Sequence, residues 1–187
     1  MAHPSRKEYF DYLRENLGDI PFLIDEESMG TAWNCERAWK VYDPSANYHI
    51  VIQDDAIICK DFKNKAVKLI EEVTKERSKI AFNFYYGTRA RFRDEASEAM
   101  KRGYIIKERP HWGLAICIPT SEIENMLKFW NTVSNPEDDE RISQFLKSRN
   151  IPVYFPIPSY IDHRHELKSL VGDPGTMRKA YKFIDNK

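Results

Sequence analysis

The stretch YHIVIQDD, residues 48–55, decides the fold class that the sequence predicts. Its first five residues are mostly β-branched or aromatic and lack a helical period, which predicts a strand covered on both faces. Two adjacent carboxylates, Asp54 and Asp55, follow this strand directly. Acids at the carboxyl end of such a strand lie where open α/β sheets bind ligands. An Asp-Asp turn is the simpler interpretation of the dipeptide alone, but a divalent cation with oxygen ligands would relieve the repulsion between the two acids.

Short apolar runs alternate with amphipathic helical patterns on both sides of this stretch. The apolar runs cover residues 1–3, 20–24 and 79–86, the helical patterns cover residues 6–17, 31–42 and 61–73, and further strand-like runs follow at 104–107, 114–119 and 151–155. This β-α-β order is typical of a parallel sheet with helices packed on it. We therefore expect an α/β fold: a single domain over residues 1–187, built as a three-layer sandwich with a mainly parallel central sheet and helices on both faces.

Composition limits the classes of partner. Lys plus Arg number 29 and Asp plus Glu number 29, so the formal net charge is zero. A neutral protein has no global field to hold it on DNA or on anionic lipid, and any nucleic-acid contact would need a local basic patch. No apolar run reaches the length of a membrane helix, and residues 1–6 are not followed by a signal-peptide core. We expect a cytoplasmic protein without a membrane partner.

The three cysteines favour the same compartment. Cys35, Cys59 and Cys117 are odd in number and widely spaced, and no CxxC pair is present. This pattern predicts reduced thiols in the core and not a disulfide framework or a zinc site.

Three further segments carry groups suited to chemistry. Asp162 and His163 open an Asp-His-Arg-His-Glu run, whose oxygen and imidazole groups suit Mn²⁺ or Mg²⁺ unless the run is simply an exposed charged loop. Asp138 and Asp139 begin a predicted helix, where the helix dipole favours acids, and a general base is the functional alternative. Arg89 lies in an aromatic and basic stretch, residues 82–93, which either contacts phosphates or is a solvated loop. The sequence has no GxSxG, no Walker loop and no GxGxxG motif, which disfavours hydrolase triads and dinucleotide oxidoreductases.

Taken in order, several motifs resemble the small GT-A-type glycosyltransferases of bacteria and their phages. The motifs are residues 30–38, 49–55, 61–62, 112–115, 138–139, 158–163 and 169–172. The resemblance covers nearly the whole chain, from about His3 to Phe183. It departs from the family in a curtailed first strand and in a contiguous Asp-Asp where the family has a spaced Asp-x-Asp.

The resemblance implies roles for particular residues. The acid pair would contact the nucleoside diphosphate sugar, for which UDP-sugars are one candidate, and Asp55 and His163 would hold a divalent metal, Mn²⁺ or Mg²⁺. Asp139, with Asp138 second, would activate the acceptor hydroxyl. The expected geometry places Asp55 and His163 within one coordination shell and Asp139 across the same cleft. Further donor-binding candidates are His3, Ser5, Arg6 and Arg89.

The expected function is therefore metal-dependent transfer of a sugar to an acceptor hydroxyl. The acceptor is a glycan, a small molecule or, if a phage encodes the chain and it works in the host cytoplasm, a modified base in DNA. Two alternatives stay open. One is a non-catalytic module that binds a nucleotide or sugar on the same fold. The other is a sugar nucleotidyltransferase, although such enzymes usually carry a glycine-rich N-terminal loop that this chain lacks.

Overall fold

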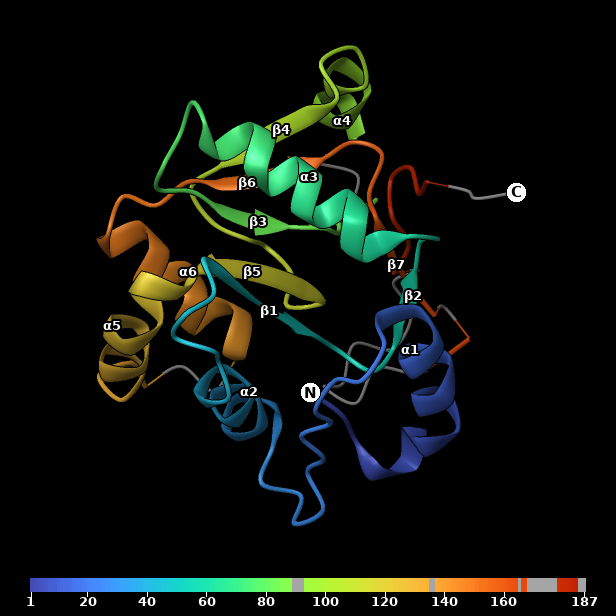
Figure 1. Ribbon diagram of the computed structural model, residues 1–187, viewed down its shortest axis with the longest axis vertical. Helices are drawn as coiled ribbons and strands as arrows, with labels where there is room; N and C mark the ends of the chain where they lie inside the picture. The colour runs from blue at the N-terminus through green and yellow to red at the C-terminus, as the bar shows by residue number, and fades with distance from the viewer. Residues whose placement is uncertain (89–92, 135–136, 165, 168–177, 185–187) are drawn as a thin grey trace.

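The computed structural model describes residues 1–88, 93–134, 137–164, 166–167 and 178–184 (Figure 1). In chain order its elements are a 3₁₀ helix η1 (Pro4–Tyr9), α1 (Phe10–Leu17), α2 (Thr31–Lys40), β1 (Tyr48–Ile52), β2 (Ala56–Ile58), α3 (Phe62–Thr74), β3 (Ala81–Asn83), α4 (Arg93–Ala99), β4 (Tyr104–Lys107), β5 (Ala115–Pro119), α5 (Thr120–Trp130), α6 (Asp138–Ser148), β6 (Val153–Pro156) and β7 (Ile161–His163). The predicted α/β class is confirmed.

The main sheet is mixed. Its strand order is β1-β5-β3-β6-β4, and among the described strands only β3 and β6 pair in parallel, while the other three pairs are antiparallel. The expectation of a mainly parallel sheet is therefore wrong. A β-α-β order gives parallel neighbours when consecutive strands lie side by side. Here β5 separates β1 from β3, and it runs opposite to both.

The first two apolar runs do not form strands of this sheet. Ala2 and Ile24 make one isolated parallel bridge. The Met1 nitrogen donates to the carbonyl oxygen of Ile52 at 3.1 Å, which places this bridge beside the end of β1. The two short segments therefore form one wall of the region around Asp54.

Helices pack on both faces of the sheet, as expected (Figure 1). On one face Ile116 and Val153 belong to a buried cluster with α2, α5 and α6. On the other face Cys117 and Tyr154, one residue further along the same strands, join a cluster with α1 and α3. This alternation is what a strand buried on both sides requires. The three cysteines are buried free thiols, as predicted.

A second, two-stranded sheet joins distant parts of the chain. β2 pairs with β7 in antiparallel register, with Ala56 opposite His163 and Ile58 opposite Ile161. The residue before Ala56 is Asp55, so this pairing brings the second acid of the quoted stretch next to His163. Across the described ranges no helix is long and apolar enough to span a bilayer.

Candidate functional site

Arg6 links the two acids that follow β1. Asp54 and Asp55 are buried, with 4% and 2% of their surfaces exposed. The Arg6 Nη1 atom lies 2.7 Å from Oδ1 of Asp54 and 3.2 Å from Oδ2 of Asp55. The backbone nitrogen of His3 donates to the other oxygen of Asp54 at 2.6 Å. At the strand end one buried guanidinium group therefore contacts both carboxylates.

A break in the N-terminal helix turns Arg6 inward. The helical pattern over residues 6–17 is divided into η1 and α1, and Arg6 has non-helical angles, φ −115° and ψ 18°. His3 is the N-cap of η1, and its ring accepts a hydrogen bond from the backbone nitrogen of Ser5. In a regular helix from residue 6 the direction of the Arg6 side chain would follow from the helical period. The non-helical angles of Arg6 instead direct this side chain toward the two acids.

Two further groups approach Asp55 from the C-terminal part of the chain. Nδ1 of His163 lies 3.5 Å from Oδ2 of Asp55, and Nη1 of Arg178 lies 3.6 Å from the same oxygen. The carboxylate of Asp162 accepts from the backbone nitrogens of His163 and Ala180, at 2.8 and 2.6 Å. Asp162 therefore binds backbone groups, and these hydrogen bonds hold β7 and the segment after residue 177 together. The predicted proximity of Asp55 and His163 is confirmed.

Several polar atoms of this cluster are buried without a hydrogen-bond partner in the described part of the chain. They are Oδ1 of Asp55, Nδ1 of His163 and Nη2 of Arg178. Burial alone would raise the pKa of Asp55, but its interactions with His163, Arg6 and Arg178 together bring the pKa below its usual value. Asp55 is therefore ionised at neutral pH. Buried polar groups are normally hydrogen-bonded, so these atoms mark a place where a water, an ion or a polar ligand would find partners.

The cluster borders a cavity of about 650 Å³. We call it the donor cavity, after the donor-binding role that the resemblance predicts for Asp54 and Asp55. It is lined by residues 1–3, 28–32 and 53–55, and by Arg6, Asp25, Asn34, Glu137, Asp138 and Arg178. This volume lies within the usual range for small-molecule sites. The walls combine acids, guanidinium groups and the apolar side chains of Met1, Met29 and Ala32, a mixture that suits a ligand with both a charged and a flat apolar part.

The start of α6 forms the opposite wall. Asp138 is buried and lines the donor cavity. A Cβ atom on Gly113 would lie 2.9 Å from Nε2 of Gln53 and 3.2 Å from Oδ2 of Asp138, so only a glycine there allows these two side chains to approach as they do. Because Gln53 directly precedes Asp54, the loop before β5 connects the acid pair with the acids of α6.

The two acids of α6 differ in their surroundings. Burial raises the pKa of Asp138, and a hydrogen bond with the Cys35 thiol offsets part of that effect. Asp139 is half-buried, and burial together with the charges of Asp138 and Glu137 raises its pKa to about 7. Asp139 is therefore the carboxyl group that changes protonation near neutral pH, which is the property of a general base.

The structure brings most of the predicted site residues together. His3, Arg6, Asp54, Asp55 and Asp138 line the donor cavity, and His163 contacts Asp55. Three predicted residues lie elsewhere. Asp139 follows the lining residue Asp138 but does not line the cavity, so its expected place across the same cleft is not confirmed. Ser5 is exposed and bonds to the His3 ring, and Arg89 lies outside the described residues.

Two residues of the cavity had no predicted role. Asp25 directly follows the apolar run 20–24. The expectation that acids after a strand lie at ligand sites would therefore have identified this residue. Its oxygens accept from the backbone nitrogens of Met29 and Gly30, which shapes the loop at the cavity edge. Arg178 lies beyond the last strand in a segment without periodicity, and no local signal indicates that it reaches Asp55.

The spacing of Asp55 and His163 allows a divalent cation that a ligand shares with the protein. Two ligands that each lie about 2.1 Å from one ion can be no more than about 4.2 Å apart, and Asp55 and His163 satisfy this limit at 3.5 Å. Arg6 and Arg178 contact the same Asp55 oxygen as His163, and the other oxygen, Oδ1, has no hydrogen-bond partner among the described residues. Within the described ranges no group of three or more His, Cys, Asp or Glu side chains is arranged to hold a metal. Mg²⁺ in nucleotide sites is commonly held by one or two carboxylates, with phosphate oxygens and water as the other ligands, and Asp55 offers one such carboxylate.

Comparison with known proteins identifies no family for this chain. No protein-family model matches the chain, and no curated protein matches its sequence significantly. The resemblance to GT-A-type glycosyltransferases stays a prediction, and the function has to be inferred from the site itself.

Proposed function

We propose that this chain is a glycosyltransferase of GT-A type, a single catalytic domain that transfers a sugar from a nucleoside diphosphate sugar to an acceptor hydroxyl. The observation that carries the proposal is the donor cavity, which has buried charged groups at one wall and the start of α6 at another. At the first wall Oδ1 of Asp55 and Nη2 of Arg178 are buried without a hydrogen-bond partner among the described residues. At the start of α6 Asp138 lines the cavity, and the next residue, Asp139, has a pKa of about 7.

The first end suits the diphosphate of the donor. Arg178 has a buried Nη2 atom without a partner among the described residues, and a phosphate oxygen is a matching acceptor. Asp55 and His163 would hold Mn²⁺ or Mg²⁺, which supplies positive charge to the leaving diphosphate when bound. The His3 backbone and Arg6 fix the acid pair in position, and the apolar side chains at the cavity edge cover the base of the nucleotide.

The second end suits proton removal from the acceptor. The acceptor oxygen forms a bond to the anomeric carbon while the bond to the diphosphate breaks, and the hydroxyl proton passes to a carboxylate oxygen of Asp139. Asp138 is the weaker candidate, because it is buried and interacts with the Cys35 thiol. A base with a pKa of about 7 is available in its ionised form at neutral pH and still binds a proton well.

Donor binding provides the direct test. A panel of UDP-sugars and other nucleoside diphosphate sugars is titrated calorimetrically into the protein with Mn²⁺ and, separately, with EDTA. We expect one donor to bind more tightly with Mn²⁺, and we expect Asp55→Asn and His163→Ala to remove that difference. Asp11→Asn is the matched control, because its side chain is 88% exposed on α1.

Two results would count against the proposal. One is that no sugar nucleotide binds, and the other is that Asp55→Asn keeps the full effect of Mn²⁺. Slow Mn²⁺-dependent hydrolysis of the bound donor supports a transferase. Tight binding without hydrolysis or transfer to any acceptor would favour the non-catalytic module, and release of pyrophosphate from a nucleoside triphosphate would favour the nucleotidyltransferase.

A further inference from the structure

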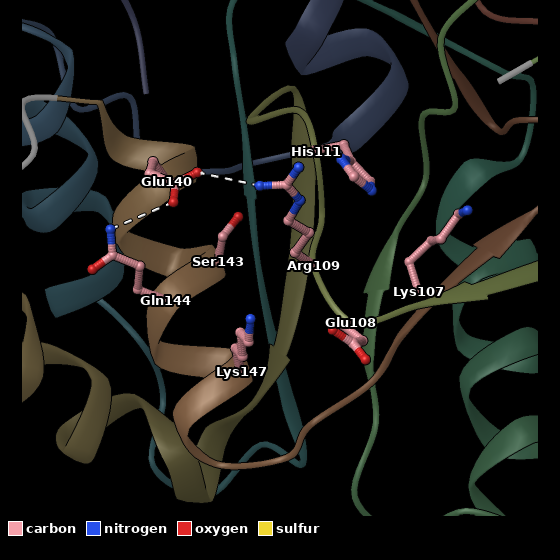
Figure 2. Close-up of a pocket in the computed structure, with 8 residues that line it drawn as sticks. All are labelled: Lys107, Glu108, Arg109, His111, Glu140, Ser143, Gln144 and Lys147. Carbon is pink, nitrogen blue, oxygen red and sulfur yellow. Dashed lines mark hydrogen bonds and ion pairs between the residues drawn. The ribbon is translucent and has the colours of Figure 1, made fainter. Parts of the chain in front are cut away.

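A second cavity lies on the other side of the loop that carries Gly113. Its volume is about 620 Å³. Figure 2 shows its two walls, with Glu140, Ser143, Gln144 and Lys147 along α6 and the side chains of Arg109 and His111 opposite them. The α6 residues are spaced by three and four positions, so they form one face of the helix. We call this space the α6 cavity.

Asp139 lies in the chain between residues of the two cavities and lines neither of them. Asp138 lines the donor cavity and Glu140 lines the α6 cavity. On the facing loop Gly113 packs on Asp138, while His111 lines the α6 cavity. A Cβ atom on Gly113 would lie 3.6 Å from the Cβ atom of Asp139, so Asp139 lies beside this loop. A ligand in the α6 cavity would therefore bind beside the turn of α6 that carries Asp139.

The α6 cavity is lined by three cations, Lys107, Arg109 and Lys147, and by two acids, Glu108 and Glu140. Glu140 lies 3.8 Å from the Arg109 guanidinium and accepts from Gln144 at 3.4 Å. Lys107 forms an ion pair with Glu95 on α4. Lys147 is exposed, and no carboxylate pairs with it among the described residues. The cavity thus combines hydroxyl, amide and carboxylate groups, which suit sugar-like hydroxyls, with a cationic end around Lys147 and Arg109.

We propose that the α6 cavity is the acceptor site and that it takes a small polyhydroxylated acceptor that carries a phosphate group. This inference rests on the proposed function and adds the class of acceptor. The phosphate is held by Lys147 and Arg109, and a hydroxyl of the same molecule faces Asp139. The volume matches a small ligand. With zero net charge the chain has no global field that would hold duplex DNA.

Binding of phosphorylated probes tests the site without requiring turnover. Pairs of molecules that differ by one phosphate, glucose 6-phosphate with glucose and thymidine 5′-monophosphate with thymidine, are titrated into the full chain by NMR, together with a short single-stranded oligodeoxynucleotide. The two pairs separate a sugar phosphate from a nucleotide as the source of the phosphate. We expect one phosphorylated member to bind at least about threefold more tightly than its neutral partner and to shift amide signals of residues 140–147.

Variants that each lack one positive charge then test where the phosphate group binds. Lys147→Ala and Arg109→Ala should each weaken binding of that probe by about three- to tenfold. Lys68→Ala is the matched control, because this lysine is exposed on α3, away from the α6 cavity, and the variant loses the same charge. We expect its affinity for the probe to equal that of the wild type.

Three outcomes overturn this inference. The first is that phosphorylated and neutral probes bind equally well. The second is that Lys147→Ala and Lys68→Ala lose the same amount of probe affinity. The third is that the oligonucleotide binds more strongly than any monophosphate, which would indicate a nucleic-acid acceptor. Donor titration of the wild-type protein is read separately. If a donor binds and these probes fail, only the acceptor class is wrong; if the probes bind as expected and no donor binds, the transferase proposal is wrong.

Discussion

Replacing Arg6 with Met tests whether one buried cation holds the acid pair in place. The substitution keeps an apolar stem and removes the guanidinium group, which lies 2.7 Å from Asp54 and 3.2 Å from Asp55. Removing one partner of a buried ion pair costs about 3–5 kcal/mol, because the other charge stays buried and unpaired. His163 and Arg178 remain within 3.6 Å of Asp55, so we expect the lower end of this range, about 3 kcal/mol. For a chain of this size the melting temperature should fall by roughly 6–12 °C.

The loss should depend on pH in a defined direction. Burial raises the pKa of Asp55, and His163, Arg6 and Arg178 outweigh that effect, so the folded-state pKa lies below the usual value. A carboxyl group with a lowered pKa stabilises the fold above its unfolded pKa and loses this contribution as the pH falls through the folded pKa. In the Arg6→Met variant part of the stabilising contribution of ionised Asp55 is lost. The difference in unfolding free energy between wild type and variant should therefore be full at neutral pH and should shrink as the pH falls below about 4.

Urea unfolding followed by circular dichroism at several pH values measures both quantities. Arg14→Met is the matched control, because Arg14 pairs with Asp11 on the surface of α1, where an ion pair contributes about 0–1 kcal/mol. The reasoning is refuted if Arg6→Met costs no more than Arg14→Met at neutral pH. It is also refuted if the deficit stays the same when the pH is lowered from 7 to well below about 4, through the folded-state pKa of Asp55.

Two further predictions concern α6 and the loop that faces it. Asp139→Asn should lower the rate of sugar transfer by about 10²- to 10⁴-fold. The wild-type rate should rise as the pH increases through about 7, where Asp139 loses its proton. If the Asp139→Asn variant keeps this rise, Asp139 is not the base. Gly113→Ala should change the free energy of unfolding by no more than about 1 kcal/mol, since the new Cβ meets the ends of two side chains. The displaced Gln53 and Asp138 should weaken donor binding by roughly tenfold, measured by calorimetry, and an unchanged donor affinity would show that this loop does not shape the cavity.

Local patterns in the sequence were sufficient for the part of the site that follows one strand. The run from Tyr48 to Ile52 is a strand with both acids at its end, because side-chain periodicity and strand ends are properties of a few neighbouring residues. The acids at the start of α6 were found for the same reason. The proximity of Asp55 and His163 came from the resemblance and not from any local pattern.

Long-range pairing decided what could not be predicted. The direction of β5 relative to β1 and β3 is set by contacts between segments far apart in the chain, and periodicity contains no information about strand direction. Arg6 has non-helical backbone angles inside η1, and the helical pattern of the sequence gives no sign of this break. Arg178 comes from a segment without a repeating pattern, so only the folded chain shows its role.

The pairing of β2 with β7 also sets how accurately this site must fold. Successive side chains of a strand point to opposite faces, and a slip of β7 by one residue in one direction would put Asp162 in the place of His163. Asp55 would then face a third carboxylate in a buried place, which repulsion disfavours. The carboxylate of Asp162 holds the backbone nitrogens of His163 and Ala180 in the observed alignment and so opposes that slip. Registry errors in this short ladder are therefore penalised by charge, independently of the hydrophobic core.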